Sequence, residues 1–306
     1  MSSSPPDGLS VRQATVGDAS AVDELITAAD VAVQGWSESS VPELLGWWRM
    51  MDLEHDSWLL HEDDALVAYA AGFAHGEAFE LDGFVHPEQR GRGFGSWLVA
   101  HGEKRARELG KRKLQAFSLA ADERAHRLFE RCGMSELRRY YRMTIELEEE
   151  PPEPKLPDGF TLETFEPEDA KAFHDALIEA FEEEWNFVAM PFDEWREMRL
   201  VKDPDYDPTL WFVVRDGGEI AAVMRNEPDR SGAGFVGALG VRKPWRRRGI
   251  AQALLHHAFG EFYRRGKRRI ALGVDAENPT GATRLYERAG MQVAFEAVTY
   301  GKELAA

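Results

Sequence analysis

The sequence predicts a mixed α/β (α+β) protein made of two similar domains, each with a central, mostly antiparallel sheet flanked by helices. The chain has 306 residues, which is more than one hydrophobic core usually supports. Its two halves repeat the same order of apolar and polar segments. A proline- and glutamate-rich stretch, 146–159, separates the halves and is typical of a stiff, solvated linker. We therefore expect domains at 1–150 and 151–306.

The elements of each half follow from the periodicity of its apolar residues. Each half opens with an edge strand and a capped amphipathic helix, and two apolar runs joined by an Asp- or Gly-containing turn then predict a hairpin. A further strand, an arginine- and glycine-rich turn, a helix, a strand and a last helix complete the pattern. The matching segments are 9–14 with 160–165, 58–60 with 211–214, 66–70 with 220–224, 114–119 with 270–274, and 127–134 with 284–291.

Composition argues against several classes of function. The net charge is −17 at pH 7, whereas a nucleic-acid-binding protein normally presents a basic face. No apolar run reaches the length of a membrane span. Cys132 is the only cysteine, so a disulfide framework and a cysteine-based zinc site are excluded, and no histidine spacing indicates a metal. We expect a cytoplasmic protein that binds no nucleic acid, membrane or metal.

A basic turn with glycine occurs once in each half, between a predicted strand and a predicted helix. Consecutive backbone N–H groups beside the positive end of a helix bind phosphate oxygens well. Glycine permits close backbone approach, and arginine adds charge-assisted contacts. A solvated basic turn is the alternative, and the glycine spacing argues against a dinucleotide site. The candidate binding residues are Leu239, Val241, Arg246, Arg247, Arg248, Gly249, Ile250 and Ala251 in the second half, and Val85, Arg90, Gly91, Arg92, Gly93, Phe94 and Gly95 in the first.

Two polar residues late in the second half are candidates for chemistry. Asn278 followed by Pro279 predicts a helix start, with asparagine as N-cap and proline at the first helical position. Tyr286 then lies about two turns along that helix. A neutral phenol, whose pKa is near 10, can donate its proton as a general acid. The alternative for Tyr286 is a core aromatic beside Leu285.

Taken together, these motifs resemble those of the GNAT family of N-acetyltransferases, and the string 241–251 is especially similar to tandem members of the mycothiol synthase type. The resemblance covers nearly the whole chain. It implies transfer of an acetyl group from acetyl-coenzyme A (acetyl-CoA) to an amine. It also implies that the strand ending at Val241 pairs with pantetheine, that the turn after it wraps the pyrophosphate, that Asn278 hydrogen-bonds the pantetheine arm, and that Tyr286 protonates the leaving thiolate.

The first half lacks the residues of the chemical step. When the halves are aligned on Gly133 and Gly290, Phe129 stands where the second half has Tyr286, and phenylalanine cannot transfer a proton. The basic turn survives in the first half. We therefore expect 1–150 to keep the fold and a second coenzyme A turn without catalysis, and 151–306 to carry the reaction.

The acceptor site and the general base are less sharply defined. By the resemblance, the acceptor groove lies near the segment that follows the first helix of the second half, where Glu182, Glu183 and Glu184 precede Trp185. A carboxylate can accept the amine's proton or anchor its ammonium form, and the indole can form an apolar wall. Solvated surface and a loop anchor are the alternatives. We name Glu182, Glu183 and Trp185 as candidate substrate residues.

The favoured function is therefore acetyl-CoA-dependent N-acetylation of a primary amine, on a small molecule, by direct transfer. Two other functions stay open at this point: a non-catalytic acyl-CoA sensor or scaffold, and a protein or peptide N-acetyltransferase. The retention of Tyr286 beside a degraded copy favours an enzyme over a sensor. Tandem architecture does not fix the acceptor, because function depends on the site.

Overall fold

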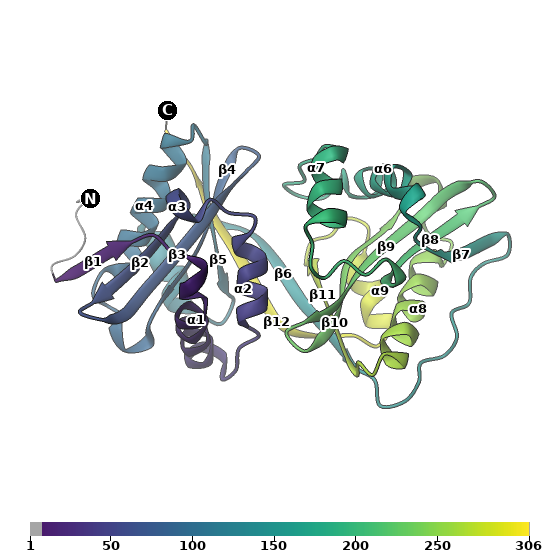
Figure 1. The fold of residues 1–306 in the computed structure, drawn as a ribbon, viewed down its shortest axis with the longest axis horizontal. Coiled ribbons are helices and arrows are strands. Elements are labelled where there is room, and N and C mark those ends of the chain that lie inside the picture. The colour runs from purple at the N-terminus through teal and green to yellow at the C-terminus, as the bar shows by residue number, and fades with distance from the viewer. Residues whose placement is uncertain (1–7, 306) are drawn as a thin grey trace. The chain divides into compact units, whose positions relative to one another are not determined.

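The computed structural model describes residues 8–305 and divides them into two compact units. Unit 1 contains the described residues up to Arg139 together with those from Glu296 onward, and unit 2 is Tyr140–Phe295. Each unit is a sheet with helices on both faces (Figure 1).

Unit 1 has a sheet in the order β1-β2-β3-β4-β5-β12. Neighbouring strands are antiparallel except for the parallel pair β4 and β5. The strands are β1 (Leu9–Arg12), β2 (Ser57–Glu62), β3 (Ala65–His75), β4 (Ala78–Val85), β5 (Lys113–Leu119) and β12 (Gln292–Glu303). The α-helices are α1 (Ala19–Gln34), α2 (Val41–Trp48), α3 (Leu53–Asp56), α4 (Phe94–Glu108) and α5 (Glu123–Arg131).

Unit 2 repeats this arrangement in the order β7-β8-β9-β10-β11-β6, again with one parallel pair, β10 and β11. The predicted mixed, mostly antiparallel sheets are thus confirmed. The strands are β6 (Ser135–Glu146), β7 (Phe160–Thr164), β8 (Trp211–Asp216), β9 (Glu219–Arg230), β10 (Ala233–Val241) and β11 (Arg269–Asp275). The helices are α6 (Ala170–Phe181), α7 (Phe192–Arg196), a π-helix (Glu197–Val201), α8 (Ile250–Arg264) and α9 (Ala282–Arg288).

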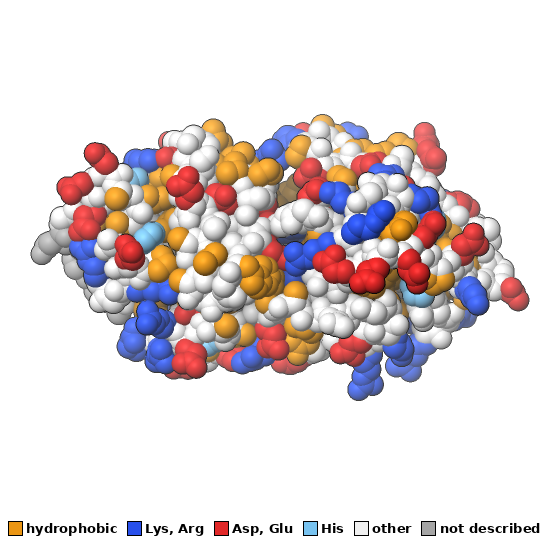
Figure 2. Space-filling model, turned by 90° about the horizontal axis from the view of Figure 1, so that it is seen from below, with side chains coloured by type: hydrophobic (Ala, Val, Ile, Leu, Met, Phe, Trp, Pro, Cys, Tyr) orange, Lys and Arg blue, Asp and Glu red, His pale blue; other side chains and the backbone are white. Residues whose placement is uncertain are grey.

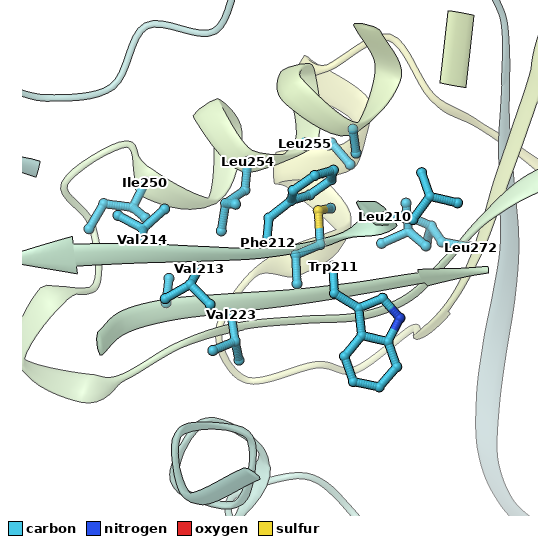
Figure 3. Close-up of a cluster of buried hydrophobic side chains, with 14 of the residues drawn as sticks. Leu210, Trp211, Phe212, Val213, Val214, Val223, Ile250, Leu254, Leu255 and Leu272 are labelled. Carbon is cyan, nitrogen blue, oxygen red and sulfur yellow. The ribbon is translucent and has the colours of Figure 1, made fainter. Parts of the chain in front are cut away.

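Helices cover both faces of the unit 2 sheet, as two successive buried residues of strand β8 show. Side chains alternate across a strand. The Trp211 ring packs against Phe173 of α6 and Trp195 of α7, with centroids 5.3 and 6.0 Å away. The next residue, Phe212, contacts His257 of α8, with ring centroids 4.5 Å apart. Figure 3 shows the two aromatic side chains on opposite sides of their strand. The α6/α7 face and the α8 face are therefore opposite faces of the sheet.

The strands that close the two units are exchanged between the halves of the chain. Strand β12, at the end of the sequence, pairs with β5 and buries Val298 and Tyr300 in the core of unit 1. Strand β6, from the first half, pairs with β11 and buries Met143 in the core of unit 2. The structure thus differs from the predicted division after residue 150, which falls inside unit 2. The chain enters unit 2 at Tyr140 and leaves it after Phe295.

Charged side chains of both signs are interleaved on the face shown in Figure 2. Many form surface ion pairs, for example Arg92 with Glu62 and Lys243 with Glu182. Exposed pairs of this kind contribute at most about 1 kcal/mol each, so burial of apolar surface holds the units together. No helix within residues 8–305 is both long and apolar enough to cross a bilayer.

The strand exchange predicts that unit 1 depends on the end of the chain. Truncation before Glu296 removes β12, exposes the edge of β5 and uncovers the core around Leu114. Loss of two large buried side chains costs roughly 3 kcal/mol or more. Hydrogen exchange should show lost protection of the β5 amides, with less change in β9. Deletion of the last two residues is the control. Unchanged protection of the β5 amides in the longer truncation would contradict the assignment of β12 to the sheet of unit 1.

Candidate active site

The parallel strands β10 and β11 separate halfway along their length. Their ladder runs from Gly234↔Ile270 to Val236↔Leu272 and ends there, although both strands continue. On its other side β10 stays paired with β9 as far as Val241↔Ala222. The edge of β10 beyond Val236 therefore turns its backbone groups toward a cavity of about 980 Å³. An extended ligand with amide groups can pair with such an edge as an added strand.

A β-bulge sits at the point where the strands separate. The β9–β10 register shifts between Val236 and Ala238 and leaves Gly237 as the extra residue. A Cβ atom on Gly237 would lie 2.8 Å from Nη2 of Arg225, so only glycine fits there without movement of the guanidinium. Bulges bend a strand and are common beside active sites. Unit 1 has no register shift in the equivalent β3–β4 ladder.

The predicted phosphate turn lies directly after β10. Arg247 and Gly249 both have positive φ angles, 63° and 86°, and α8 begins at Ile250. Positive φ curls the backbone so that successive N–H groups point into one concavity, next to the unsatisfied N–H groups of the first helical turn. An arginine whose backbone adopts this left-handed conformation costs about 1 kcal/mol of stability. This backbone conformation is typical of anion-binding turns, and Arg247 and Gly249 both line the cavity.

The structure brings most of the predicted binding residues of the second half to this one cavity. Arg248 is exposed and is not among the residues that line it. The predicted residues on the cavity wall are Leu239, Val241, Arg246, Arg247, Gly249, Ile250, Ala251, Asn278, Tyr286, Glu183 and Trp185.

The side chain of Arg246 binds protein groups. Its Nη1 donates to Glu183 at 2.6 Å, and its Nε and Nη2 donate to the backbone oxygens of Val241 and Ala180 at 3.1 and 3.2 Å. The guanidinium thus ties the turn to the end of α6. The contact of Arg246 with phosphate stays a prediction.

The glutamates after α6 divide into two roles. Glu182 and Glu183 are exposed and accept hydrogen bonds from Lys243 and Arg246, both at 2.6 Å, so they hold the turn in place. Glu182 is not on the cavity wall. Glu184, which was not among the candidate substrate residues, lines the cavity together with Glu183 and Trp185. Three consecutive glutamates carry no sequence signal that separates them, because the direction of each is set by where α6 ends.

Asn278 lies in a turn before the last helix. Its Nδ2 donates to Glu184 at 2.7 Å, and its Oδ1 accepts from the backbone N of Thr280 at 2.8 Å. Helix α9 begins at Ala282, after Gly281 with φ 79°. The prediction of a helix start at Asn278 is therefore wrong, because the asparagine closes its own turn and Gly281 takes the N-cap position. Asn278 still reaches the cavity.

Tyr286 lies on α9 at the cavity wall and is 8% exposed. It packs against the apolar core of unit 2, so both predicted environments, core and cavity, apply to it. Burial raises the pKa of the Tyr286 phenol well above its ordinary value, and the negative charge of Glu184 raises it further. The phenol therefore stays protonated throughout the physiological range. A protonated hydroxyl beside an elongated cavity can serve as a proton donor.

Comparison with known proteins decides the family. The profile of the Acetyltransferase (GNAT) family matches residues 21–134 and 170–291, once in each repeat and together over more than half of the chain. The chain belongs to the GNAT acetyltransferase family. It is accordingly an acyltransferase, and the family uses acetyl-CoA.

Several GNAT relatives resemble this chain over most of its length. The mycothiol acetyltransferase of Thermobispora bispora is 30% identical over 242 residues, which cover 76% of this chain and 78% of the relative. That of Streptomyces avermitilis is 32% identical over 244 residues, 76% and 75% of the two chains. The crystal structure of a GCN5-related N-acetyltransferase from Sphaerobacter thermophilus has 36% identity, a TM-score of 0.87, and coverage of 98% and 97%. A tandem GNAT protein from the clavulanic acid pathway shares the fold at 16% identity, with a TM-score of 0.73 and coverage of 97% and 99%.

The GNAT repeat of unit 1 has its own cavity, of about 740 Å³. Its turn has Gly91 and Gly93 at φ 86° and 91°, followed by α4. Nη2 of Arg90 donates to the Ala29 backbone oxygen at 3.3 Å, as Arg246 does to Ala180 in unit 2. Arg92 is not on the cavity wall and pairs with Glu62. The predicted residues that line this cavity are Val85, Arg90, Gly91, Gly93, Phe94 and Gly95, together with Phe129 in the place of a tyrosine.

Two aspartates line the unit 1 cavity near the point where the β4–β5 ladder ends. Asp82 of β4 and Asp30 of α1 both line it. Burial, together with the charge of Asp30, raises the pKa of Asp82 to about 7. Asp82 is nevertheless exposed by its accessible surface, so solvent in the cavity screens part of this effect. Among residues 8–305, no group of three or more His, Cys, Asp or Glu side chains is arranged to hold a metal ion.

The positive φ of Gly249 predicts that a methyl group at this position lowers the stability of the protein. Gly249→Ala should lower the free energy of unfolding by about 1 kcal/mol or more, because alanine disfavours φ near 86° although no atom within 4 Å opposes its Cβ. Gly218→Ala is the matched control in the same unit, since Gly218 has open space and no positive φ in that range. Urea unfolding measures both, and equal effects would contradict the strained turn.

The raised pKa of Asp82 predicts a pH-dependent stability of unit 1. An aspartate titrates near 4 in the unfolded chain, so the folded state binds the proton more tightly between about pH 4 and 7. Stability should therefore fall as pH rises through this window. Asp82→Asn should remove that part of the pH dependence and raise the melting temperature at pH 8. A variant that melts at the same or a lower temperature at pH 8 would rule out this account of Asp82.

Proposed function

We propose that unit 2 is an acetyl-CoA-dependent N-acetyltransferase that acts on a primary amine of a small molecule by direct transfer. The observation that carries the proposal is the position of Tyr286 on the wall of the cavity at the separated strands, where unit 1 has Phe129. Both repeats keep the phosphate turn, and only the second keeps a proton donor. The relatives named mycothiol acetyltransferase support a small-molecule acceptor.

The diphosphate of coenzyme A would bind the main-chain N–H groups from Arg247 to Ala251, at the positive end of α8. The pantetheine arm would then pair with the free edge of β10 along Leu239 and Val241. Asn278 faces the same cavity and has an amide that can bond the arm. This placement extends the thioester toward the bulge at Gly237.

The reaction requires a neutral amine and an acid for the leaving sulfur. The amine nitrogen attacks the thioester carbonyl carbon, a C–N bond forms, and the C–S bond breaks as the tetrahedral intermediate collapses. Tyr286 donates its proton to the departing sulfur, which leaves as the thiol. The amine loses one proton, and Glu184 lies on the cavity wall where a carboxylate can receive it directly or through water. The tyrosinate is reprotonated from solvent after product release.

A second function, acyl-CoA binding without chemistry, is favoured for unit 1. Its turn and cavity are retained, while Phe129 fills the place of the acid and cannot donate a proton. In that role unit 1 would bind the same nucleotide group through Gly91 and Gly93. Peptide acceptors for unit 2 are not favoured by any specific observation.

Replacement of the proposed acid provides the test of this function. Tyr286→Phe should lower kcat for thiol release from acetyl-CoA by about 10²- to 10⁴-fold with little change in KM, because the phenyl ring keeps the packing and removes only the proton. Phe129→Leu is the control in the other repeat and should leave kcat within about twofold. Equal losses in the two folded variants, or full activity of Tyr286→Phe, would refute the assignment of chemistry to unit 2.

A further inference from the structure

A cluster of arginines lies on the α6/α7 face of the unit 2 sheet, next to the bulge. We define the arginine cluster as Arg142, Arg199, Arg225 and Arg230. The register pairs Arg225 with Trp211 on one side and with Ala238 on the other, so its side chain projects to the same face as Trp211. Its Nη2 reaches the space that a side chain on Gly237 would fill. The cluster thus begins where Gly237 meets the cavity, and its members lie outside the cavity wall itself.

Two members of the cluster stack on one aromatic ring. The guanidinium carbon of Arg142 lies 4.9 Å from the centroid of the Phe235 ring, and that of Arg230 lies 4.4 Å from it. Phe235 pairs with Glu227 across the β9–β10 ladder, so the ring is on the same face as Arg225. Stacking fixes the plane of a guanidinium and so orients the N–H groups at its edge.

The other two members are close to each other and to two carboxylates. Arg225 donates to Glu227 at 2.8 Å with its side chain only 11% exposed, and Arg199 lies 3.6 Å from Asp203. Burial lowers the pKa of Arg199, and the positive charge of Arg225 lowers it further. Burial alone would raise the pKa of Glu227, yet the charges of Arg225 and Arg230 outweigh it and lower that pKa. The Arg199 shift thus reflects mainly burial, whereas the Glu227 shift reflects the positive charge of its neighbours.

The backbone that carries Arg199 is itself unusual. Arg199 lies in the π-helical turn Glu197–Val201 that follows α7. Such turns are rare and occur frequently at functional sites, because they redirect a side chain at a cost in helix stability. Here the turn places a partly buried guanidinium beside Arg225, where repulsion opposes it.

The same face of unit 1 has the opposite charge, so the fold itself does not require these arginines. In the β3–β4 ladder, Asp82 pairs with Ala71 and Glu80 pairs with Phe73, at the positions that correspond to the bulge region of unit 2. Burial raises the pKa of both carboxyl groups. The two repeats therefore share a fold and a phosphate turn but offer opposite charges beside the separated strands.

We propose that the acceptor of unit 2 carries an anionic group, a carboxylate or a phosphate, which binds the arginine cluster while its amine reaches the thioester beside Gly237. Guanidinium groups form strong, bidentate hydrogen bonds with both anions. The proposal rests on the proposed acetyl transfer in unit 2.

Matched pairs of ligands test the inference on the full chain saturated with coenzyme A. Glucosamine 6-phosphate against glucosamine is the phosphate arm, and phenylalanine against phenylalaninamide is the carboxylate arm. Calorimetry should show at least a tenfold tighter Kd for the anionic member of one arm, and the arm identifies the anion. With acetyl-CoA, the same member should have the lower KM.

Two variants link any preference to the cluster. Arg199→Gln and the double variant Arg225→Gln/Glu227→Gln, which removes both members of the buried pair together, should abolish the tenfold preference. Both variants should raise KM for the anionic acceptor more than they lower kcat. Arg264→Gln on α8, which is exposed on the other face, is the control and should keep the preference.

The outcomes separate this inference from the proposed function. Equal binding within both pairs, no binding of either anionic ligand, or a preference that survives both cluster variants would overturn the anionic acceptor. Acetylation of neutral amines with unchanged efficiency in the variants would also overturn it, while leaving the acetyltransferase intact. An anion preference lost in the variants, with no thiol release from any amine, would support the binding site and contradict the acetyl transfer.

Discussion

The separation of β10 from β11 is the constraint on which the rest of unit 2 depends. A parallel ladder that stopped later would pair the backbone of β10 with β11 and leave no edge for a ligand. The bulge at Gly237 bends β10 at this point, and the left-handed turn at Arg247 and Gly249 then directs the chain into α8. The strand separation, the bulge and the left-handed turn thus follow one another along the chain. Each lowers the stability of the fold, and such features are common at functional sites.

Tertiary contacts hold this irregular segment in place. Arg246 joins the turn to the end of α6, Lys243 does so through Glu182, and Arg242 does so through Glu179 at 2.6 Å. Arg242, Lys243 and Arg246 therefore stabilise the shape of the turn. Unit 1 uses glycine at both left-handed positions, whereas unit 2 keeps an arginine at the first of them.

The sequence was sufficient for the repeat, the sheets, the turn and the cavity-lining positions of Tyr286 and Phe129. It could not reveal the exchange of β6 and β12, because contacts between segments far apart in the sequence decide which sheet each strand joins. It also misplaced the start of α9, since Asn278-Pro279 suits a turn as well as a helix. Among the three glutamates considered, Glu182 was named as a substrate residue and Glu184 was not, because only the end of α6 decides which carboxylates line the cavity. Each miss concerns a choice made by tertiary contacts among locally equivalent options.

A crystal structure of the full chain with a non-hydrolysable acetyl-CoA analogue tests the central claim most directly. The account predicts that, in unit 2, the diphosphate lies within hydrogen-bond distance of the N–H groups from Arg247 to Ala251, that the pantetheine arm follows β10, and that the Tyr286 hydroxyl contacts the sulfur position. A diphosphate bound elsewhere, or a sulfur position out of reach of that hydroxyl, would contradict it.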